Sequence, residues 1–529
     1  MKQKLFYLVT LLLCMPVGMF AYEQIGQLNP YAYAVEAESQ NGILSVTYKL
    51  NAPADSTILA IYCDGVEVGT QAVEDNSLGS HSAVVDFTQF THEGDYTVGI
   101  RVYKQSYDAP FQLKEIIDGS IDTTALCYAF FHPKGVDIDR NPFSPYFGRI
   151  LTAEAMQDTP DVGYRSSADK CGLYAFDATF SPIDNGNTSA FKGGIEYATR
   201  MSNGTTHAYA PYRIRISKDG RIFVSMQDDR MSPLYEVSAD LQTWTPIFSN
   251  ALTDGVALDA DGNYITGINC GLDVRGEGED LEIIMLNCNT NAFSSYSGND
   301  FMIATYKLGT ATSWSGAATT ADTLSAVVGS EVVPVAANCG IAYDETEGYW
   351  YIGNRAAAIA QRALVHVDAA GVADWALSEN DSVLFSLNGN GLNGGGNARL
   401  QDGMLIIGTG QRVGGTGHMQ IFDVNHAAGS APVLTKKYEM DLIGISRNLN
   451  DFAIDYGHNL YTIGNSNEKI VPVALPYDGM VETPVAAEIL VEALDNINGD
   501  AKVQKVIENG QVVIIKNGVR YNALGTVLQ

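Results

Sequence analysis

The stretch "RIRISKDGRIFVS", residues 213–225, has two short runs of alternating apolar and polar residues on either side of Asp219-Gly220. Alternation with a period of two is typical of half-buried β-strands, and Asp-Gly is a strong signal for a tight hairpin turn. Similar units recur as "GVALDADGNYITG" (255–267), "GIAYDETEGYWYIG" (340–353), "ARLQDGMLIIG" (398–408) and "FAIDYGHNLYTIG" (452–464). The sequence therefore predicts a repeated antiparallel hairpin.

The spacing of these units predicts the architecture. The steps between their turn glycines are 42, 86, 55 and 54 residues, taken at Gly220, Gly262, Gly348, Gly403 and Gly457. The longest step is about two units, which indicates a degenerate unit near residues 298–300, and "NPFSPYFGRILTAEA" (141–155) precedes the series. Units of about 40–50 residues with about four strands are typical of β-propeller blades. We expect an all-β chain with a propeller of about seven blades over residues 120–480.

Residues 22–105 predict a separate β-sandwich, because short alternating runs are divided by turn residues such as Asp64-Gly65. Three stretches resemble the FlgD-type immunoglobulin-like (Ig-like) module: "ILSVTYKLNAPAD" (43–55), "IYCDGVEV" (61–68) and "EGDYTVGIRV" (93–102). The resemblance implies a spacer or assembly unit.

Two further resemblances concern the propeller and the tail. "NPFSPYFGRI" (141–150) and "NDFAIDYGHNLYTIGN" (450–465) resemble secreted Bacteroidetes-type propellers, loosely of the NHL or gluconolactonase-like kind. Within residues 485–529, "ENGQVVIIKNGVRYNALG" (508–525) resembles the end of a type IX secretion sorting domain, and its Asn-Gly pairs predict a short β-hairpin. The resemblance implies outer-membrane secretion machinery as a partner; the alternative is a hairpin at the edge of the propeller.

The N-terminus predicts export. Lys2 and Lys4 precede a short apolar run, Leu5–Cys14, and small or neutral residues lead to Ala21, so residues 1–21 are typical of a signal peptide. A lipoprotein signal ending at Cys14 is the alternative. No later segment has the roughly 20 apolar residues that a transmembrane helix needs. We expect a secreted or cell-surface protein.

Composition excludes some classes of partner and site. The chain has 61 acidic and 32 basic residues, a net charge of −29, which disfavours nucleic acid. Its cysteines form no CxxC pair, so zinc is unsupported; Cys270 and Cys288 predict either a disulfide or buried thiols. No GxSxG, HExxH or phosphate-binding lysine loop occurs. "DADGN" (259–263) resembles the start of a calcium loop but also suits a plain turn, so we expect no cofactor, with Ca²⁺ or another divalent cation as the alternative.

Polar residues that lead into the first strand of each unit are the candidate binding site, because these positions converge on one mouth of the central channel. The repeat alignment places seven of them there: Tyr212, Arg213, Asp254, Asn338, Asn397, Asn450 and Asp451. Arg399 and Arg447 add charged donors. Such a mouth suits a polar ligand or glycan. The alternative is that these side chains satisfy strand ends and hold channel water.

Three functions fit these patterns. The first is a non-catalytic propeller that binds a glycan or protein ligand at the channel mouth. The second is a metal-assisted hydrolase or lactonase of the gluconolactonase-like kind, for which Asp254, Asn338, Asn450 and Asp451 are the nearest metal ligands. The third is a structural or adhesive envelope protein. A propeller by itself does not choose among them.

Overall fold

The computed structural model is all-β, with two short 3₁₀ helices, Phe87–Gln89 and Gly278–Asp280, among the described residues. No helix in this part of the chain is long and apolar enough to cross a membrane. The structure describes residues 27–92, 94–113, 130, 133–155, 172–183, 194–197, 211–226, 232–248, 256–258, 264–267, 271–287, 302–314, 319–320, 326–328, 331–333, 340–344, 348–352, 362–368, 373–378, 398–409, 417–426, 432–442, 449–464, 470–486, 503–508, 511–516, 519–522 and 527–528. The predicted signal peptide lies outside these residues.

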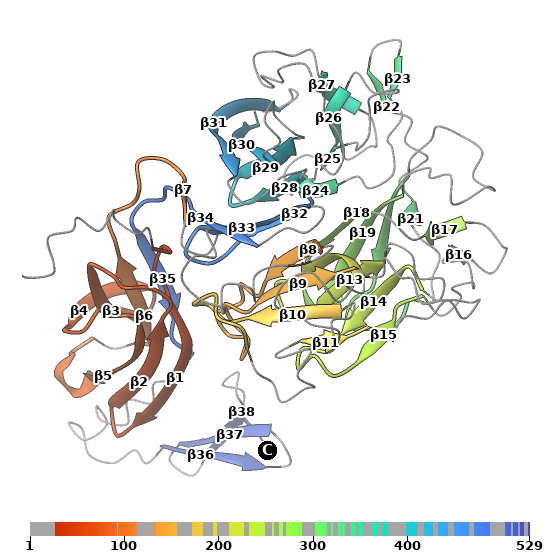
Figure 1. Ribbon diagram of the computed structural model, residues 1–529. Coiled ribbons are helices and arrows are strands. Elements are labelled where there is room, and N and C mark those ends of the chain that lie inside the picture. Colours follow the sequence, from red (N-terminus) through yellow and green to blue (C-terminus); the bar gives the residue numbers. More distant parts are fainter. Residues whose placement is uncertain are drawn as a thin grey trace, which may run out of the picture.

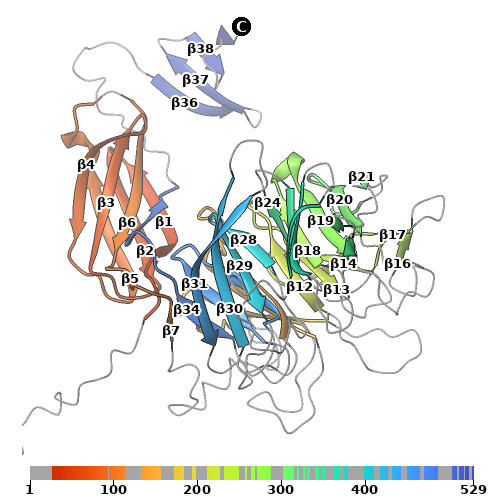
Figure 2. The same ribbon diagram turned by 90° about the horizontal axis from the view of Figure 1, so that it is seen from above.

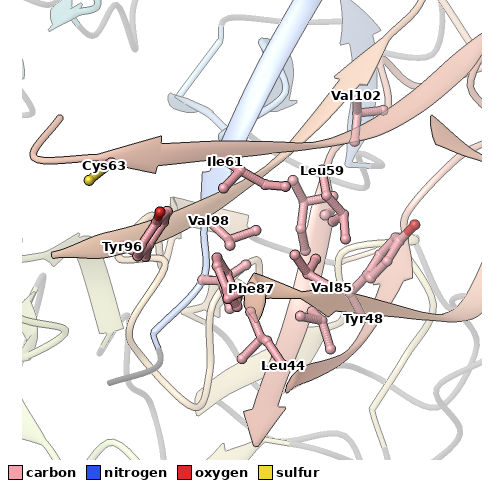
Figure 3. Packing of buried hydrophobic residues seen from close by; sticks show 14 of the residues in the cluster. Leu44, Tyr48, Leu59, Ile61, Cys63, Val85, Phe87, Tyr96, Val98 and Val102 are labelled. Atoms are coloured by element: carbon pink, nitrogen blue, oxygen red, sulfur yellow. The ribbon is translucent and has the colours of Figure 1, made fainter. Parts of the chain in front are cut away.

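Two antiparallel sheets pack face to face in the N-terminal part (Figure 1). One sheet has the order β1 (Ala32–Gln40), β2 (Ile43–Leu50) and β5 (Gly79–Asp86). The other has the order β35 (Met480–Pro484), β6 (Tyr96–Tyr103), β3 (Ser56–Cys63) and β4 (Val66–Val73). Along β2 every second side chain is buried, as the alternation in its sequence predicts. Figure 3 shows the shared core, in which side chains such as Leu44, Leu59 and Val85 meet between the sheets.

The edge strand β35 reaches this sandwich from beyond the propeller. It pairs antiparallel with β6, from Met480 opposite Tyr103 to Pro484 opposite Gly99. Glu482 of β35 accepts hydrogen bonds from Arg101 Nε at 2.8 Å and from the Tyr62 hydroxyl at 2.7 Å. The sheet of β6, β3 and β4 thus takes its fourth strand from a distant part of the chain, since Glu482 lies 381 residues after Arg101. The propeller is inserted between two strands of one sandwich.

Six four-stranded antiparallel sheets make up the larger body among the described residues. The first two sheets consist of β8 (Pro133–Ile138), β9 (Ile150–Glu154), β10 (Gly172–Phe176) and β11 (Ile195–Glu196), and of β12 (Pro211–Ile216), β13 (Ile222–Met226), β14 (Leu234–Val237) and β15 (Trp244–Pro246). The third and fourth consist of β18 (Gly271–Arg275), β19 (Glu282–Asn287), β20 (Met302–Lys307) and β21 (Thr319–Thr320), and of β24 (Gly340–Asp344), β25 (Gly348–Ile352), β26 (Arg362–Asp368) and β27 (Ala373–Ser378). The fifth and sixth consist of β28 (Ala398–Gln401), β29 (Met404–Thr409), β30 (Gly417–Asn425) and β31 (Val433–Leu442), and of β32 (Asp451–Ile454), β33 (Asn459–Ile463), β34 (Val471–Ala474) and β7 (Phe111–Gln112).

The first strands of these sheets form a closed ring (Figures 1 and 2). β8 contacts β12, β12 contacts β18, β18 contacts β24, β24 contacts β28, β28 contacts β32, and β32 contacts β8 again. Strands near the axis are covered on both faces by neighbouring sheets, so every residue of β8 is buried, whereas the outer β31 alternates between buried and exposed side chains. This is a β-propeller arrangement.

The last sheet is completed by the segment that precedes the propeller. β7 pairs with β34 through Gln112 opposite Val473 and Phe111 opposite Ala474, and the two strands lie side by side in both ribbon views. Residues 111–112 therefore belong to a blade, although they lie before the expected start of the propeller at residue 120. The N-terminal and C-terminal ends of the propeller are joined in one sheet, which closes the ring.

Two repeat assignments differ from the structure. Segment 255–267, which the repeat alignment treats as the core of a blade, contributes the separate two-stranded sheet of β16 (Val256–Leu258) and β17 (Tyr264–Gly267). Instead, β18 is the first strand of the third sheet, and β20, which lies within "FMIATYKLG" (301–309), is its third strand. The ring in the described residues consequently holds six sheets, against the expectation of about seven.

Besides β16 and β17, the described residues form two further small sheets outside the ring and the sandwich. β22 (Ala326–Val328) and β23 (Glu331–Val333) form a hairpin, and β36 (Val503–Glu508), β37 (Gln511–Lys516), β38 (Val519–Asn522) and β39 (Val527–Leu528) form a four-stranded sheet in the tail. The hairpin predicted from the Asn-Gly pairs is present as β36–β38 and is extended by β39.

Buried hydrogen bonds fix the sandwich to the propeller. Asn29 donates its backbone N–H to Asn459 Oδ1 at 2.7 Å, and Asn459 Nδ2 donates to the Asn29 carbonyl at 3.0 Å. The same amide group donates to Asp455 Oδ2 at 2.9 Å, and Asp455 Oδ1 also accepts the N–H of Gly457 at 2.9 Å. Since Asn29 and Asn459 are 0% exposed, water cannot replace these bonds.

Replacing Asn459 with alanine is expected to lower the free energy of unfolding by about 1–3 kcal/mol, because buried groups of Asn29 and Asp455 lose their partner. Urea unfolding followed by tryptophan fluorescence measures it. Asn425→Ala is the control: Asn425 is exposed and its amide lies 3.5 Å from Thr435 Oγ1. Equal losses in both variants would contradict the junction's role.

Asp455 makes the stability of this junction depend on pH. Burial raises the pKa of Asp455 from its ordinary value of 3.8 to about 7, although hydrogen bonds from Asn459 and Gly457 lower it. The folded state therefore holds a proton that the unfolded chain loses. The contribution is complete below about pH 3.8 and is lost as the pH rises through about 7.

The difference in unfolding free energy between the native chain and Asp455→Asn should fall steadily as the pH rises from about 3.8 to about 7. Urea midpoints measured across this range at constant ionic strength test it. The subtraction removes the titration of the other acidic groups. A pH-independent difference would show that Asp455 is ionised in the fold.

Candidate functional site

The inner edge of each first strand faces the propeller axis, where the described residues contribute no further strand to pair with it. Side chains from the neighbouring first strand accept these backbone N–H groups instead. Four such bonds are made: Ile216 N to Asp137 Oδ2 at 2.8 Å, Tyr343 N to Asp273 Oδ2 at 2.7 Å, Ile454 N to Gln401 Oε1 at 3.0 Å and Val136 N to Asp451 Oδ2 at 3.2 Å. The ring therefore requires polar side chains along its axis to accept these N–H groups.

Two arginines neutralise the carboxylates that accept these backbone N–H groups at the axis. Arg215 lies 3.0 Å from Asp451 and 3.7 Å from Asp273, and Arg399 lies 2.5 Å from Asp137. Burial lowers the pKa of Arg215, but the three carboxylates outweigh burial and raise it overall. Burial raises the pKa of Asp273, while Arg215 and Arg399 oppose that change. The axis carries charge in compensated pairs.

The end of the channel at the start of the first strands is filled by side chains. Arg213 Nη1 donates to the Lys134 carbonyl at 2.7 Å and to the Asn450 carbonyl, and its guanidinium lies 4.4 Å from the centre of the Tyr212 ring. Asn450 Nδ2 donates to the carbonyls of Pro133 at 2.6 Å and Gly464 at 3.0 Å. Burial, reinforced by Arg213, lowers the pKa of Lys134 to about 7. These groups hold strand starts together.

A cavity of about 940 Å³ opens at the opposite end of the channel, where the first strands finish. We call it the funnel. Its walls are the turns that follow β8, β12 and β28, at residues 140–143, 217–219 and 402–403, together with Asp273, Tyr343, Asp344 and His426. Its volume lies within the ordinary range for small-molecule sites. Arg215 and Arg399 are part of its lining, so the paired charges form the base of the funnel.

The turn after β8 is held rigidly at the rim. Ser144 Oγ donates to Asp139 Oδ2 at 2.6 Å, and Phe143 N donates to Asn141 Oδ1 at 3.0 Å. Arg140 Nη2 binds both oxygens of Asp402, at 3.0 and 2.9 Å, which ties this turn to the turn after β28. The held turn displays Phe143, whose side chain is 63% exposed. A fixed, exposed aromatic ring at a polar cavity can stack on a ligand at little entropic cost.

His426 and Asp344 form a buried pair on the funnel wall. Their side chains approach to 2.9 Å through His426 Nε2, and Asp344 is 2% exposed. His426 Nδ1 has no hydrogen-bond partner among the described residues. The Asp344 carboxylate fixes the orientation of the His426 imidazole ring in the funnel wall.

The predicted site residues divide into three groups. Arg399 lines the funnel. Tyr212, Arg213, Asn450 and Asp451 lie along the first strands toward the filled end, where they bind other protein groups. The remaining four lie outside the described residues: Asp254, Asn338, Asn397 and Arg447. Ligand binding by these nine residues stays a prediction.

Several funnel residues were not predicted from the sequence. Arg140, Phe143, Asp273, Tyr343 and His426 lie at the ends of first strands, in the following turns or on an outer strand. The repeat alignment contained a signal for some of them, because it locates every hairpin turn as readily as every strand start. It could not show that the open end of the channel is the one beside the turns.

The contacts of Asp451 argue against its role as a metal ligand. Its carboxylate accepts hydrogen bonds from Arg215 and from the Val136 N–H, so its oxygens are already engaged. Among the described residues no group of three or more His, Cys, Asp and Glu side chains could hold a metal. Asp254, Asn338, the calcium-like stretch 259–263 and the Cys270–Cys288 pair lie outside those residues.

No family model matches this chain, and no curated protein matches it. Solved structures that resemble it include a luciferin-regenerating enzyme, at 11% identity and a TM-score of 0.36, covering 67% of this chain and 96% of that one. An α-L-arabinofuranosidase from Clostridium thermocellum has 9% identity and a TM-score of 0.25, with coverages of 66% and 93%. Drosophila Semaphorin 1a has 9% identity and a TM-score of 0.31, with coverages of 85% and 87%. Likenesses this distant carry no argument about activity.

Replacing Arg215 with methionine should lower the unfolding free energy by about 3–5 kcal/mol, because the buried Asp451 carboxylate and the partly exposed Asp273 carboxylate lose their partner. The double variant Arg215→Met, Asp451→Asn should recover part of this loss. Urea unfolding measures both. Lys307→Met is the control, since its pair with Asp280 is exposed and is worth about 0–1 kcal/mol. An equal loss in the control would contradict the compensated axis.

Proposed function

We propose that this protein is a non-catalytic propeller, exported to the cell surface or beyond, that binds a neutral glycan segment in the funnel. The observation that carries the proposal is the combination of a cavity of about 940 Å³ with an exposed aromatic ring, Phe143, on a hydrogen-bonded turn at its rim. Stacking on a ring and hydrogen bonding to polar walls are the two interactions that a sugar offers, because a pyranose has both an apolar face and many hydroxyl groups.

The charges of the funnel disfavour an anionic ligand. Arg215 and Arg399 are paired with carboxylates, and Arg140 is paired with Asp402, so these three guanidinium groups are already compensated. The whole chain carries a net charge of −29, which repels polyanions at long range. Paired guanidinium and carboxylate groups still offer donors and acceptors to hydroxyl groups.

The other parts of the chain complete the proposal. We infer that residues 1–21 direct export, that the N-terminal sandwich is an Ig-like module of FlgD type, and that the tail beyond residue 485 serves type IX secretion or surface attachment. The resemblances in "IYCDGVEV" (61–68) and "ENGQVVIIKNGVRYNALG" (508–525) support these assignments. Mass determination of the N-terminus after export tests the first of them.

Replacing Phe143 with alanine should weaken glycan binding about three- to tenfold, because a stacked ring is worth about 0.5–1.5 kcal/mol. Affinity gel electrophoresis in gels containing starch, hydroxyethylcellulose, xylan or mannan measures retardation, with polygalacturonate as the anionic comparison.

Val66→Ala is the control, because Val66 is 66% exposed but lies on β4 of the sandwich. Retardation by no neutral polysaccharide, or equal retardation of the native chain and Phe143→Ala, would overturn the proposal.

A further inference from the structure

A second cavity, of about 450 Å³, lies between the sandwich and the propeller. We call it the junction groove. One wall is formed by Tyr33 to Glu36 of β1, and the other by the turn after β8, residues 142–147, with Arg149 and Asp177. Pro142 and Phe143 line both the junction groove and the funnel. The two cavities therefore meet at the exposed Phe143 ring.

We propose that the funnel and the junction groove are one continuous site for a linear, neutral oligosaccharide that crosses Phe143. The proposal rests on the proposed function and names its substrate class: a chain of several sugar units rather than a single sugar. The sandwich then supplies part of the binding surface, in addition to any role as a spacer.

The chemistry of the junction groove is similar to that of the funnel. The Tyr146 ring carries the Arg149 guanidinium at 4.0 Å from its centre, and Glu36 presents an exposed carboxylate from β1. Asp177 adds a second carboxylate to the lining. The walls therefore contain both aromatic rings and carboxylates, which suits a ligand that has both apolar faces and hydroxyl groups.

The two walls are held in a fixed relation, which an extended rigid site requires. The Tyr31 ring contacts the rings of Tyr33, Phe147 and Tyr456 at centroid distances of 6.3, 5.7 and 6.1 Å. Tyr456 also donates its hydroxyl to the Glu482 carbonyl of β35 at 2.8 Å. Residues of the sandwich and of the propeller thus form one aromatic cluster behind the groove. A preformed groove loses little conformational entropy on binding.

An extended peptide fits this groove less well than a glycan. β1 is an edge strand, and an edge strand can accept an additional strand from a partner. However, the register of β1 with β2 shifts between Tyr33 and Glu36, and Ala34 has a φ of +49°. A bulge at this point disrupts the regular row of N–H and C=O groups that a peptide strand would need.

The test compares ligand lengths in two variants of one strand. Glu36→Ala removes a carboxylate from the groove, whereas Glu38→Ala removes an equally exposed carboxylate that does not line it. Isothermal titration with the disaccharide and the hexasaccharide of the malto-, cello-, xylo- and manno-series gives the affinities. Both side chains are exposed, so neither variant should impair folding; thermal melting of each verifies this.

The native chain should bind a hexasaccharide at least about tenfold more tightly than its disaccharide. Glu36→Ala should weaken the hexasaccharide about tenfold and leave the disaccharide unchanged, since the longer ligand loses a charge-assisted hydrogen bond to the Glu36 carboxylate in the junction groove. Glu38→Ala should change neither affinity.

Equal affinity for both lengths, or an equal effect of the two glutamate variants, would overturn the continuous site but leave the funnel as a glycan site. Absence of binding by any of these sugars would overturn the funnel as well. Binding of an extended peptide in competition with the hexasaccharide would assign the groove to a protein partner instead.

Discussion

The whole propeller depends on how the inner edge of each first strand is satisfied. In the part of the chain that the structure describes, six strands face a common axis, and no strand lies further inside to pair with them. Asp137, Asp273, Gln401 and Asp451 fill this role by reaching across to the next strand. Carboxylates in this position must be compensated, and Arg215 and Arg399 compensate them. The charged axis is therefore part of the framework.

This requirement also separates the parts of the channel that can bind a ligand from those that cannot. Where the first strands start, Arg213 and Asn450 are committed to backbone carbonyls. Where they end, the chain turns away from the axis, so the walls diverge and the funnel opens. A ligand at this end meets the rims of the hairpin turns, and the compensated charges lie below it. Arg215 and Arg399 thus stabilise the ring and also line the base of the funnel.

Chain connectivity explains why the sandwich belongs to the same rigid unit. The chain leaves β6, adds β7 to the last blade, builds the ring and returns as β35 to pair with β6. The propeller is held to the sandwich at both of its ends, and the Asn29–Asn459 bonds fix the contact between them. A groove shared by both bodies can keep one shape only because of this double attachment. The aromatic cluster around Tyr31 fills the space behind it.

The sequence by itself determined the strands, the hairpin turns and the blade-like repeat, because the period-two alternation and the turn residues are local properties. It located the alternating runs of β2 and the turn at Asp219-Gly220. It also identified Arg399 as a residue near the channel. Strands and hairpin turns can be predicted from local patterns because they depend mainly on neighbouring residues.

Only the tertiary structure decided which sheet each strand joins and which end of the channel is open. β7 and β35 are short strands whose partners lie hundreds of residues away, so no local pattern assigns them. Likewise, 255–267 reads as a blade core although β18 takes that place, because pairing and packing choose between similar hairpins. Arg215 and Phe143 have their roles only through the ring: one is buried among carboxylates from other blades, and the other is exposed where two cavities meet.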